Sequence, residues 1–253
     1  MLLTRTVRLA LVPGRGCAPT LRPWHAVDGW CAAFEIDVHV AGTPDSTTGY
    51  IVGIQEVDRV VKEAGARIIP ESFMQGHSIE SVLRPFREQV RAALGLQVES
   101  LSIRPHPACI LRNEETMPDS VTLTQRFEFA ASHRLHCADL SDAENRRVFG
   151  KCNNPAGHGH NYRLEIEVRL PLCEPPRLRA EEVDRIARES VVDRLDHRHL
   201  NTDVEAFRDR NPSVETIAKT CFDWLAAPMS AAGGELVRVR LWETEKTSAI
   251  YPG

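Results

Sequence analysis

A cysteine and two histidines stand close together within the run from Phe149 to Tyr162. Cys152 lies six residues before a His-Gly-His sequence that begins at His158 and ends at His160, and an alternating apolar pattern follows. Side chains alternate along a β-strand, so the two histidines would share one face, roughly 7 Å apart. One metal ion could bind between their imidazoles, beside the thiol. These residue types therefore predict a reactive metal site.

A third histidine could complete this site. The run from Val121 to His133 also alternates, and His133 falls on its apolar face. If this strand pairs with the strand after Gly159, His133 would meet His158 and His160. Three histidines with an open fourth position are typical of a catalytic zinc, which acidifies a bound hydroxyl. The alternative is that they are surface or packing residues, but the spacing and the nearby cysteine favour the metal.

The motifs resemble the 6-pyruvoyl-tetrahydropterin synthase family, which includes the 6-carboxytetrahydropterin synthases of the queuosine pathway. They occur in the family's order between about Val121 and Tyr251: Ser132-His-Arg-Leu135, Cys152, His158-Gly-His-Asn-Tyr162, Leu195-Asp-His197 and Trp242-Glu-Thr244. The resemblance implies that His133, His158 and His160 bind zinc. It also implies that Cys152 is the base, with Asp196 and His197 as proton-relay partners. Glu243 would anchor the pterin ring.

The family's reaction explains why these residue types would be needed. Its substrate is 7,8-dihydroneopterin triphosphate, which loses protons from C1′ and C2′ of its side chain, eliminates triphosphate and redistributes hydrogen into the ring. A metal that holds the side-chain oxygens acidifies the adjacent C–H bonds, and a thiolate is a competent base. A glutamate can accept two hydrogen bonds from the pterin edge. No organic redox cofactor is required, and we find no Gly-rich dinucleotide or phosphate loop in the right context.

Several of these residues also have ordinary structural interpretations. Asp196 and His197 follow a helical run and could form a charge cluster at a helix C-terminus. Glu243 could be a solvated strand residue. Cys152 could be an inert small residue, although the Asn- and Pro-containing loop after it favours exposure.

Two weaker pocket candidates, Ser213 and Glu215, open a helix after Pro212. They could be only an N-cap and a first-turn acid. The resemblance implies a place near the pterin for this segment, so both stay as candidate substrate-binding residues. His199 forms a second His-x-His with His197 in a polar loop, and we do not interpret it as a ligand.

The second half of the chain predicts an α+β unit in the order ββααββ. Strands are expected over 121–133 and 159–171, helices over 180–195 and 213–227, and a hairpin of 236–242 with 247–251. This order resembles the tunnelling fold, in which antiparallel sheets carry helices on one face and join edge to edge into an oligomeric barrel. The connection 172–179, with Pro175 and Pro176, departs from the family's usual turn.

The first half repeats this order without the chemistry. Strands are expected over 4–12 and 31–40, helices near 54–64 and 78–94, and a hairpin of 101–104 with 108–112. Asp28-Gly-Trp30 stands before the second strand in place of His-Gly-His, and Arg104-Pro-His-Pro107 in place of the segment with Glu243. We predict two domains, a degenerate and non-catalytic tunnelling-fold copy over 1–116 and a catalytic domain over 117–253, with a linker at 114–120.

The global properties agree with this organisation. The 253 residues suit two units that each bury a core. A net charge of −4 and a pI near 6.2 give no support for nucleic-acid binding. The seven cysteines have no disulfide-like spacing, and neither a signal peptide nor a membrane-spanning apolar stretch is evident. We therefore expect a cytoplasmic protein without nucleic-acid or membrane partners.

Three functional interpretations remain open. The first is a 6-pyruvoyl-tetrahydropterin synthase, a zinc-dependent carbon–oxygen lyase that acts on the pterin triphosphate. The second is a 6-carboxytetrahydropterin synthase acting on the same substrate, and the third is a non-catalytic pterin- or purine-binding scaffold. The five-residue gap between Cys152 and His158 resembles the first branch, and the intact residue set argues against the third. Family members are usually hexamers, so a tandem chain is expected to form a homotrimer, a pseudo-hexamer with three active sites.

Overall fold

The computed structural model describes residues 1–11, 32–173 and 177–253, and it divides into two compact units. The first comprises Met1–Leu123 with Leu170–Arg179, and the second Thr124–Arg169 with Ala180–Gly253. The ends of two predicted strands (Val12 and Cys31), the Asp28-Gly-Trp30 sequence and the two prolines of the 172–179 connection (Pro175 and Pro176) lie outside the described residues.

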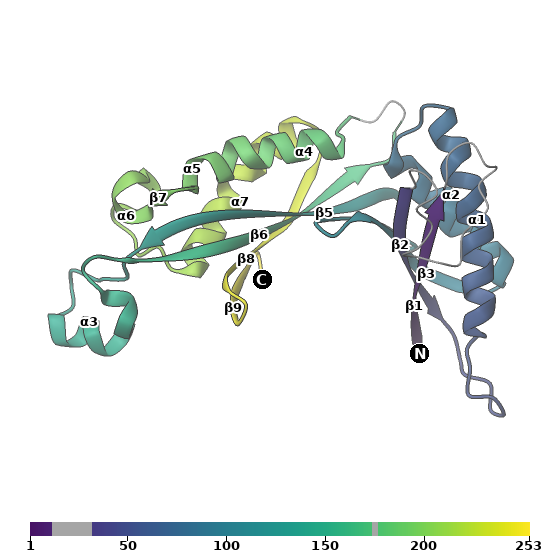
Figure 1. Cartoon of the computed structure of the whole chain (residues 1–253), viewed down its shortest axis with the longest axis horizontal. Helices are drawn as coiled ribbons and strands as arrows, with labels where there is room; N and C mark the ends of the chain where they lie inside the picture. The colour runs from purple at the N-terminus through teal and green to yellow at the C-terminus, as the bar shows by residue number, and fades with distance from the viewer. Residues whose placement is uncertain (12–31, 174–176) are drawn as a thin grey trace. The chain divides into compact units, whose positions relative to one another are not determined.

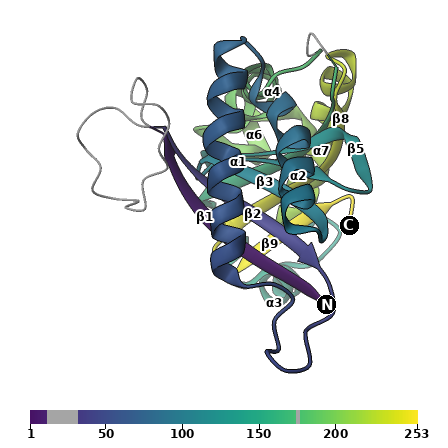
Figure 2. The ribbon, with the colours of Figure 1, turned by 90° about the vertical axis from the view of Figure 1, so that its right-hand side faces the viewer.

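The first unit is an antiparallel sheet with two helices on one face, as Figure 2 shows. Its elements are β1 (Leu2–Leu11), β2 (Ala32–Ala41), α1 (Ile54–Met74), α2 (Ile79–Leu94), β3 (Gln97–His106) and β4 (Cys109–Glu114). The strands adjoin in the order β1-β2-β3-β4, with Leu9 opposite Phe34 and Ile36 opposite Ile103. Alternate residues such as Val38 and Val40 are fully buried, because a strand turns every second side chain toward the helices.

Helix α1 is longer than predicted. The prediction ended it at residue 64, just before Gly65, but the helix continues to Met74. The helix continues through Gly65 because side chains of β1 and α2 pack directly against its backbone, in the space that a side chain at this position would occupy. A Cβ at this position would lie 2.7 Å from Leu9 Cδ2 and 3.1 Å from Phe86 Cζ. Close helix–sheet packing therefore outweighs the low intrinsic helix propensity of glycine.

The second unit has the same order of two strands, helices and two strands. Its main elements are β5 (Met117–His133, whose first residues belong to the first unit), α3 (Asp142–Phe149), β6 (His158–Pro171), α4 (Ala180–Ala187), α7 (Val214–Ala231), β8 (Glu235–Thr244) and β9 (Thr247–Tyr251). The sheet order is β5-β6-β8-β9, and α7 covers β8 and β9 (Figure 1). Helices on one face of an antiparallel sheet confirm the predicted α+β class.

Short elements fill the connections of the second unit. A π-helical turn (Arg188–Val192) joins α4 to α5 (Asp193–Leu195), so the predicted helix over 180–195 is continuous but irregular. β7 (Arg198–His199) pairs with β5 in parallel, and α6 (Leu200–Asp203) and a 3₁₀ turn (Glu205–Phe207) follow. Helix α3 was not predicted, because its residues are mainly polar. A capping box between Ser141 and Glu144 starts it.

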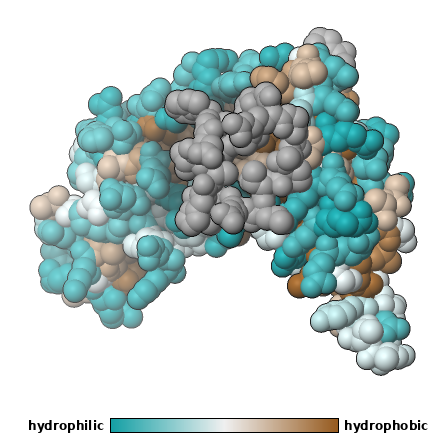
Figure 3. Space-filling view, turned by 45° about the vertical axis from the view of Figure 1, so that its right-hand side comes forward, coloured by the Kyte–Doolittle hydropathy of each residue, from teal (hydrophilic) through white to brown (hydrophobic). Residues whose placement is uncertain are grey.

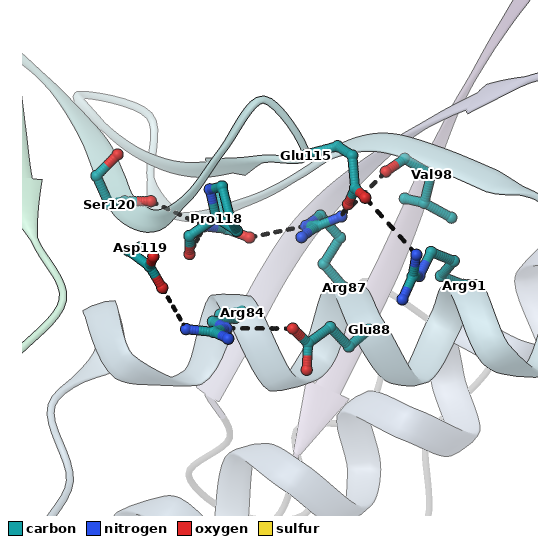
Figure 4. Close-up of polar contacts among 10 residues, drawn as sticks. Arg84, Arg87, Glu88, Arg91, Val98, Glu115, Pro118, Asp119 and Ser120 are labelled. Atoms are coloured by element: carbon teal, nitrogen blue, oxygen red, sulfur yellow. Dashed lines mark hydrogen bonds and ion pairs between the residues drawn. The ribbon is translucent and has the colours of Figure 1, made fainter.

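The segment predicted as a linker, 114–120, consists of a tight turn at 115–116 and the strand ends beside it, because Glu114 ends β4 and Met117 begins β5. A buried arginine of α2 holds it, as Figure 4 shows. Arg87, 2% exposed, donates from Nε to Asn113 Oδ1 at 2.8 Å and from a terminal nitrogen to the Glu115 carboxylate. The Asn113 amide in turn donates to the carbonyls of residues 118 and 120. Because these groups are buried and bonded, the turn is fixed in place.

The surface is mainly polar. Figure 3 shows hydrophilic residues over most of the face toward the viewer, with apolar residues in small separate patches. The most exposed large apolar side chains of the described residues include Met1, Phe73 and Met74. Across the described ranges, none of the helices combines the length and apolarity needed to cross a membrane.

Candidate metal centre and thiol site

Three histidines converge where β5 ends and β6 begins. His133 is the last residue of β5, and His158 and His160 share one face at the start of β6, the neighbouring strand. The Nε2 atoms of His133 and His158 lie 3.1 Å apart. One nitrogen from each ring lies within 4.8 Å of the other two. The predicted pairing of the two strands and the meeting of the three rings are both confirmed in the structure.

The environment of His133 determines which of its ring nitrogens faces His158 and His160. The side chain is fully buried, and its Nδ1 lies 2.7 Å from the carbonyl oxygen of Pro212, to which it donates. The Tyr162 hydroxyl lies 3.4 Å from the same nitrogen. Burial, above all, lowers the pKa of His133 to about 4, so the ring is neutral at pH 7. A neutral imidazole held through Nδ1–H presents the lone pair of Nε2, as metal-binding histidines do.

The nitrogens of the other two rings are suited to a metal ion. Nε2 of His160 is buried and, among the described residues, has no hydrogen-bond partner, and Nε2 of His158 is the nitrogen that faces His133. Burial also lowers the pKa of His158, which favours its neutral form. Ligands of a tetrahedral zinc with about 2.1 Å bonds stand about 3.4 Å from each other, so small side-chain rotations would complete the geometry. The three residues therefore fit a divalent ion that prefers nitrogen ligands.

The carboxylate of Glu243 lies next to two of the three histidines, His133 and His160. It follows Trp242 near the end of β8, where Trp242 pairs with Arg163 of β6. Its Oε1 is 3.4 Å from His133 Nε2 and 3.6 Å from His160 Nε2, and the side chain is 17% exposed. The carboxylate can thus reach a molecule that lies against the three histidines.

Cys152 lies in a 3₁₀ turn (Gly150–Asn153) that follows α3. Its carbonyl accepts a hydrogen bond from the Leu135 amide, and the Asn153 side chain donates to the Leu135 carbonyl, so the turn is tied to the chain beyond His133. The partly buried cysteine shares a cavity of about 890 Å³ with His158. The predicted proximity of thiol and histidines is therefore present in the structure.

A glycine sets the approach between this turn and the histidines. Gly157 has φ of +72°, and a Cβ there would lie 3.0 Å from the His133 carbonyl oxygen and 3.0 Å from His199 Nε2. Both the left-handed backbone and the close approach require glycine at this position.

Asp196 and His197 form a separate pair held against β5. His197 Nδ1 is 2.9 Å from Asp196 Oδ2, and the other carboxylate oxygen accepts from the Ala130 amide at 2.8 Å. The His197 amide donates to the Ala130 carbonyl. These hydrogen bonds lower the pKa of Asp196, mainly through the Ala130 amide. The His197 side chain is 84% exposed, and its φ of +56° is a strained conformation for a non-glycine residue.

The structure does not join this pair to the thiol. Within the part of the chain that is described, no hydrogen bond or ion pair connects Cys152 with Asp196 or His197. Instead, His197 lines a different cavity of about 600 Å³ together with His160 and Asp203. The expected proton relay is therefore incomplete within one copy of the chain.

The two weaker candidates have structural roles. Ser213 is the N-cap of α7 and accepts from the Thr216 amide at 3.4 Å, and Glu215 is an exposed acid in the first turn of that helix. The segment nevertheless lies near the histidines, because the Pro212 carbonyl accepts from His133. This contact was missed from the sequence, since a backbone acceptor leaves no side-chain signal.

The fold and the site define a class of protein: an antiparallel α+β domain with a three-histidine centre beside a cysteine. Residues 122–253 match the family model of 6-pyruvoyl tetrahydropterin synthase, and the chain belongs to this family. The resemblance seen in the motifs is thereby confirmed.

Each of three similar proteins covers about half of the chain. The 6-pyruvoyl tetrahydrobiopterin synthase of Drosophila melanogaster is 41% identical over 133 residues, which are 52% of this chain and 79% of that protein. The Homo sapiens synthase is 35% identical over 134 residues, 52% of this chain and 90% of the relative. The solved structure of the Caenorhabditis elegans 6-pyruvoyl tetrahydropterin synthase is 37% identical with a TM-score of 0.49, and covers 53% of this chain and 96% of its own.

Proposed function

We propose that this chain is a carbon–oxygen lyase that converts 7,8-dihydroneopterin triphosphate to 6-pyruvoyl-tetrahydropterin and releases triphosphate. The observation that carries the proposal is the convergence of His133, His158 and His160 next to the cavity of Cys152, in the half that matches the family. The names of its relatives favour the pyruvoyl product over the carboxy product.

In this proposal His133, His158 and His160 hold a zinc ion. Zinc, when bound, supplies a Lewis acid that polarises the substrate side-chain oxygens. The carboxylate of Glu243 accepts hydrogen bonds from the amino and ring N–H edge of the pterin, which fixes the ring beside the histidines. Cys152, as thiolate, takes a proton from a side-chain carbon. His197, oriented by Asp196, then exchanges protons with solvent and substrate.

We also infer that the chain is a homotrimer in which a second copy completes each active site. Two observations support this assembly: His197 is largely exposed, and no contact among the described residues joins it to Cys152 within one copy. The first unit has the same order of strands and helices and would be the degenerate copy. Three chains of two units each would then supply the six units of a hexamer. Across the described ranges, the candidate metal-binding group lies in the second unit alone.

A complementation experiment tests this assembly. Cys152→Ala and His197→Ala variants would each be inactive. Mixed and reassembled from separate chains, they should regain about a quarter of wild-type activity per site if thiol and imidazole come from neighbouring copies. A monomeric mass in solution at micromolar concentration, or mixtures as inactive as the parents, would contradict the assembly.

The reaction itself is tested by incubating purified, zinc-loaded protein with 7,8-dihydroneopterin triphosphate and identifying the products by mass spectrometry. Triphosphate release with a 6-pyruvoyl product is expected, and Cys152→Ala should abolish it. A 6-carboxy product with acetaldehyde would instead place the chain in the queuosine branch. Absence of turnover with zinc bound would leave a pterin-binding scaffold and refute the lyase.

We place this reaction in the cytoplasm. The five cysteines that the structure describes are free thiols, which suits a reducing compartment.

A further inference from the structure

The cavity that contains Cys152 and His158 has a basic wall. It is lined by Arg134, Arg146 and Lys151, with one acid, Asp142, among the lining residues. Three cations against one carboxylate leave an excess of positive charge directly beside the proposed base. A cavity of this charge attracts anions, and its low-dielectric walls strengthen the field.

Two of these cations have no partner for their charge within the described part of the chain. Arg146 lies in the last turn of α3 and Lys151 in the turn that follows, and both are exposed. Over the described ranges neither side chain makes a hydrogen bond or an ion pair. Other arginines of the same unit are paired, as Arg126 is with Glu165 and Arg238 with Glu167. Two cations without an ion-pair partner therefore lie beside the reactive side chains.

The third cation is held in position. Arg134 donates from Nε to the Asn153 carbonyl at 3.3 Å, and one terminal nitrogen lies 3.2 Å from His136 Nδ1. These contacts leave further N–H groups of the guanidinium to donate elsewhere. The turn that carries Lys151 is fixed in the same way, because the Asn153 side chain donates to the Leu135 carbonyl. The wall is thus partly preorganised.

We propose that Arg146 and Lys151, beside the fixed Arg134, form a subsite for a polyphosphate, the triphosphate group of the substrate. The inference rests on the proposed function and names the part of the substrate that this wall holds. In the elimination, the thiolate takes the proton from C2′, the C–H electron pair forms the C2′–C3′ double bond, and the C3′–O bond breaks. Its electron pair leaves on the triphosphate, so cations at this wall stabilise the charge that develops there.

Asp142 gives the subsite an internal control. Its carboxylate is exposed in the first turn of α3 and lines the same cavity. It repels a polyphosphate, and Asp142→Asn removes that charge at nearly constant shape. This variant should bind inorganic triphosphate more tightly than the wild type, in the opposite direction to loss of the cations.

The experiment is calorimetric titration of the full-length, metal-loaded protein with inorganic triphosphate. The double variant Arg146→Gln with Lys151→Gln should raise the dissociation constant about tenfold or more, because it removes two charge-assisted contacts to the triphosphate. A matched double variant, Arg147→Gln with Lys246→Gln, removes the same charge. Arg147 projects about 100° around α3 from Arg146, and Lys246 lies in the β8–β9 turn, so this control should bind like the wild type.

Metal content, far-ultraviolet circular dichroism and solution mass are measured for every variant. Unchanged binding in the cation double variant, equal losses in both double variants, or no binding by the wild type would each overturn the subsite. Binding does not depend on turnover. A wild type that fails to convert the pterin, but loses triphosphate binding only in the cation double variant, would refute the proposed reaction and retain the subsite.

Discussion

At the scale of single residues, the site depends on neutral nitrogens that face a common point. Burial keeps His133 neutral, and the Pro212 carbonyl selects its tautomer. Because β5 and β6 are neighbours in the sheet, the alternation of strand residues lets His133, His158 and His160 share one face of it. The position of Glu243 was not predictable in this way. It depends on the register of β8 against β6 and on an irregularity of pairing between Trp242 and Thr244.

Glu243→Gln separates two roles for this carboxylate. In the proposed site the three histidines alone hold the metal, so we expect zinc content to stay at the wild-type level while KM for the pterin triphosphate rises roughly 30-fold. This corresponds to about 2 kcal/mol for hydrogen bonds to a charged acceptor. Metal analysis and steady-state kinetics are the measurements.

The matched control for that variant is Glu245→Gln, which removes a charge from an exposed position two residues further on and should change neither quantity. Loss of zinc from Glu243→Gln would show that the carboxylate is a metal ligand instead of a pterin anchor.

At the scale of elements, the polar segments are where sequence patterns failed. The alternating strands and the amphipathic helices α2 and α7 were predicted within a few residues, because burial imposes their periods. Helix α3 was not predicted, since Asn145 is its one buried residue and side-chain hydrogen bonds to the preceding loop hold it in place. The Asn145 amide donates to the carbonyls of Cys137 and Leu140, neither of which a local pattern reveals.

The turn between β4 and β5 depends on one buried charge, the guanidinium of Arg87. Arg87→Met should lower the free energy of unfolding by about 2–4 kcal/mol, since it leaves the buried Asn113 Oδ1 without its donor and takes one of two arginine partners from Glu115. Urea unfolding followed by circular dichroism measures this loss. Arg84→Met is the control, because its ion pairs with Glu88 and Asp119 are exposed and contribute less than about 1 kcal/mol. Equal effects of the two variants would contradict a special role for the buried arginine.

At the scale of the whole molecule, two units share one order of elements, but the chemistry-bearing residues lie in the second. The family model matches residues 122–253, which lie almost entirely in that second unit. The repeated order of strands and helices was readable from the sequence. The sequence did not reveal how Asp196 and His197 would reach the Cys152 thiol, because the described residues of a single chain do not make that contact.

Removal of the metal should destabilise the molecule as a whole. A ligand present at about 100 times its dissociation constant stabilises the folded state by about 2.7 kcal/mol. Chelation should therefore lower the Tm of the zinc-loaded wild type by several degrees, as read by calorimetry. His160→Ala should start from the lower Tm and show no further change with chelator. A wild type whose Tm ignores the chelator would argue against a metal held by the three histidines.

The left-handed glycine before His158 has a consequence for how this site can diverge. Gly157 is enclosed by the His133 carbonyl and the His199 ring, so its spacing to the histidines is fixed. An inserted or deleted residue can be absorbed only between Cys152 and Gly157, in the exposed stretch of residues 154–156. Loop length there would tune the reach of the thiol while the metal ligands stay in register, giving evolution a single adjustable spacer between base and metal.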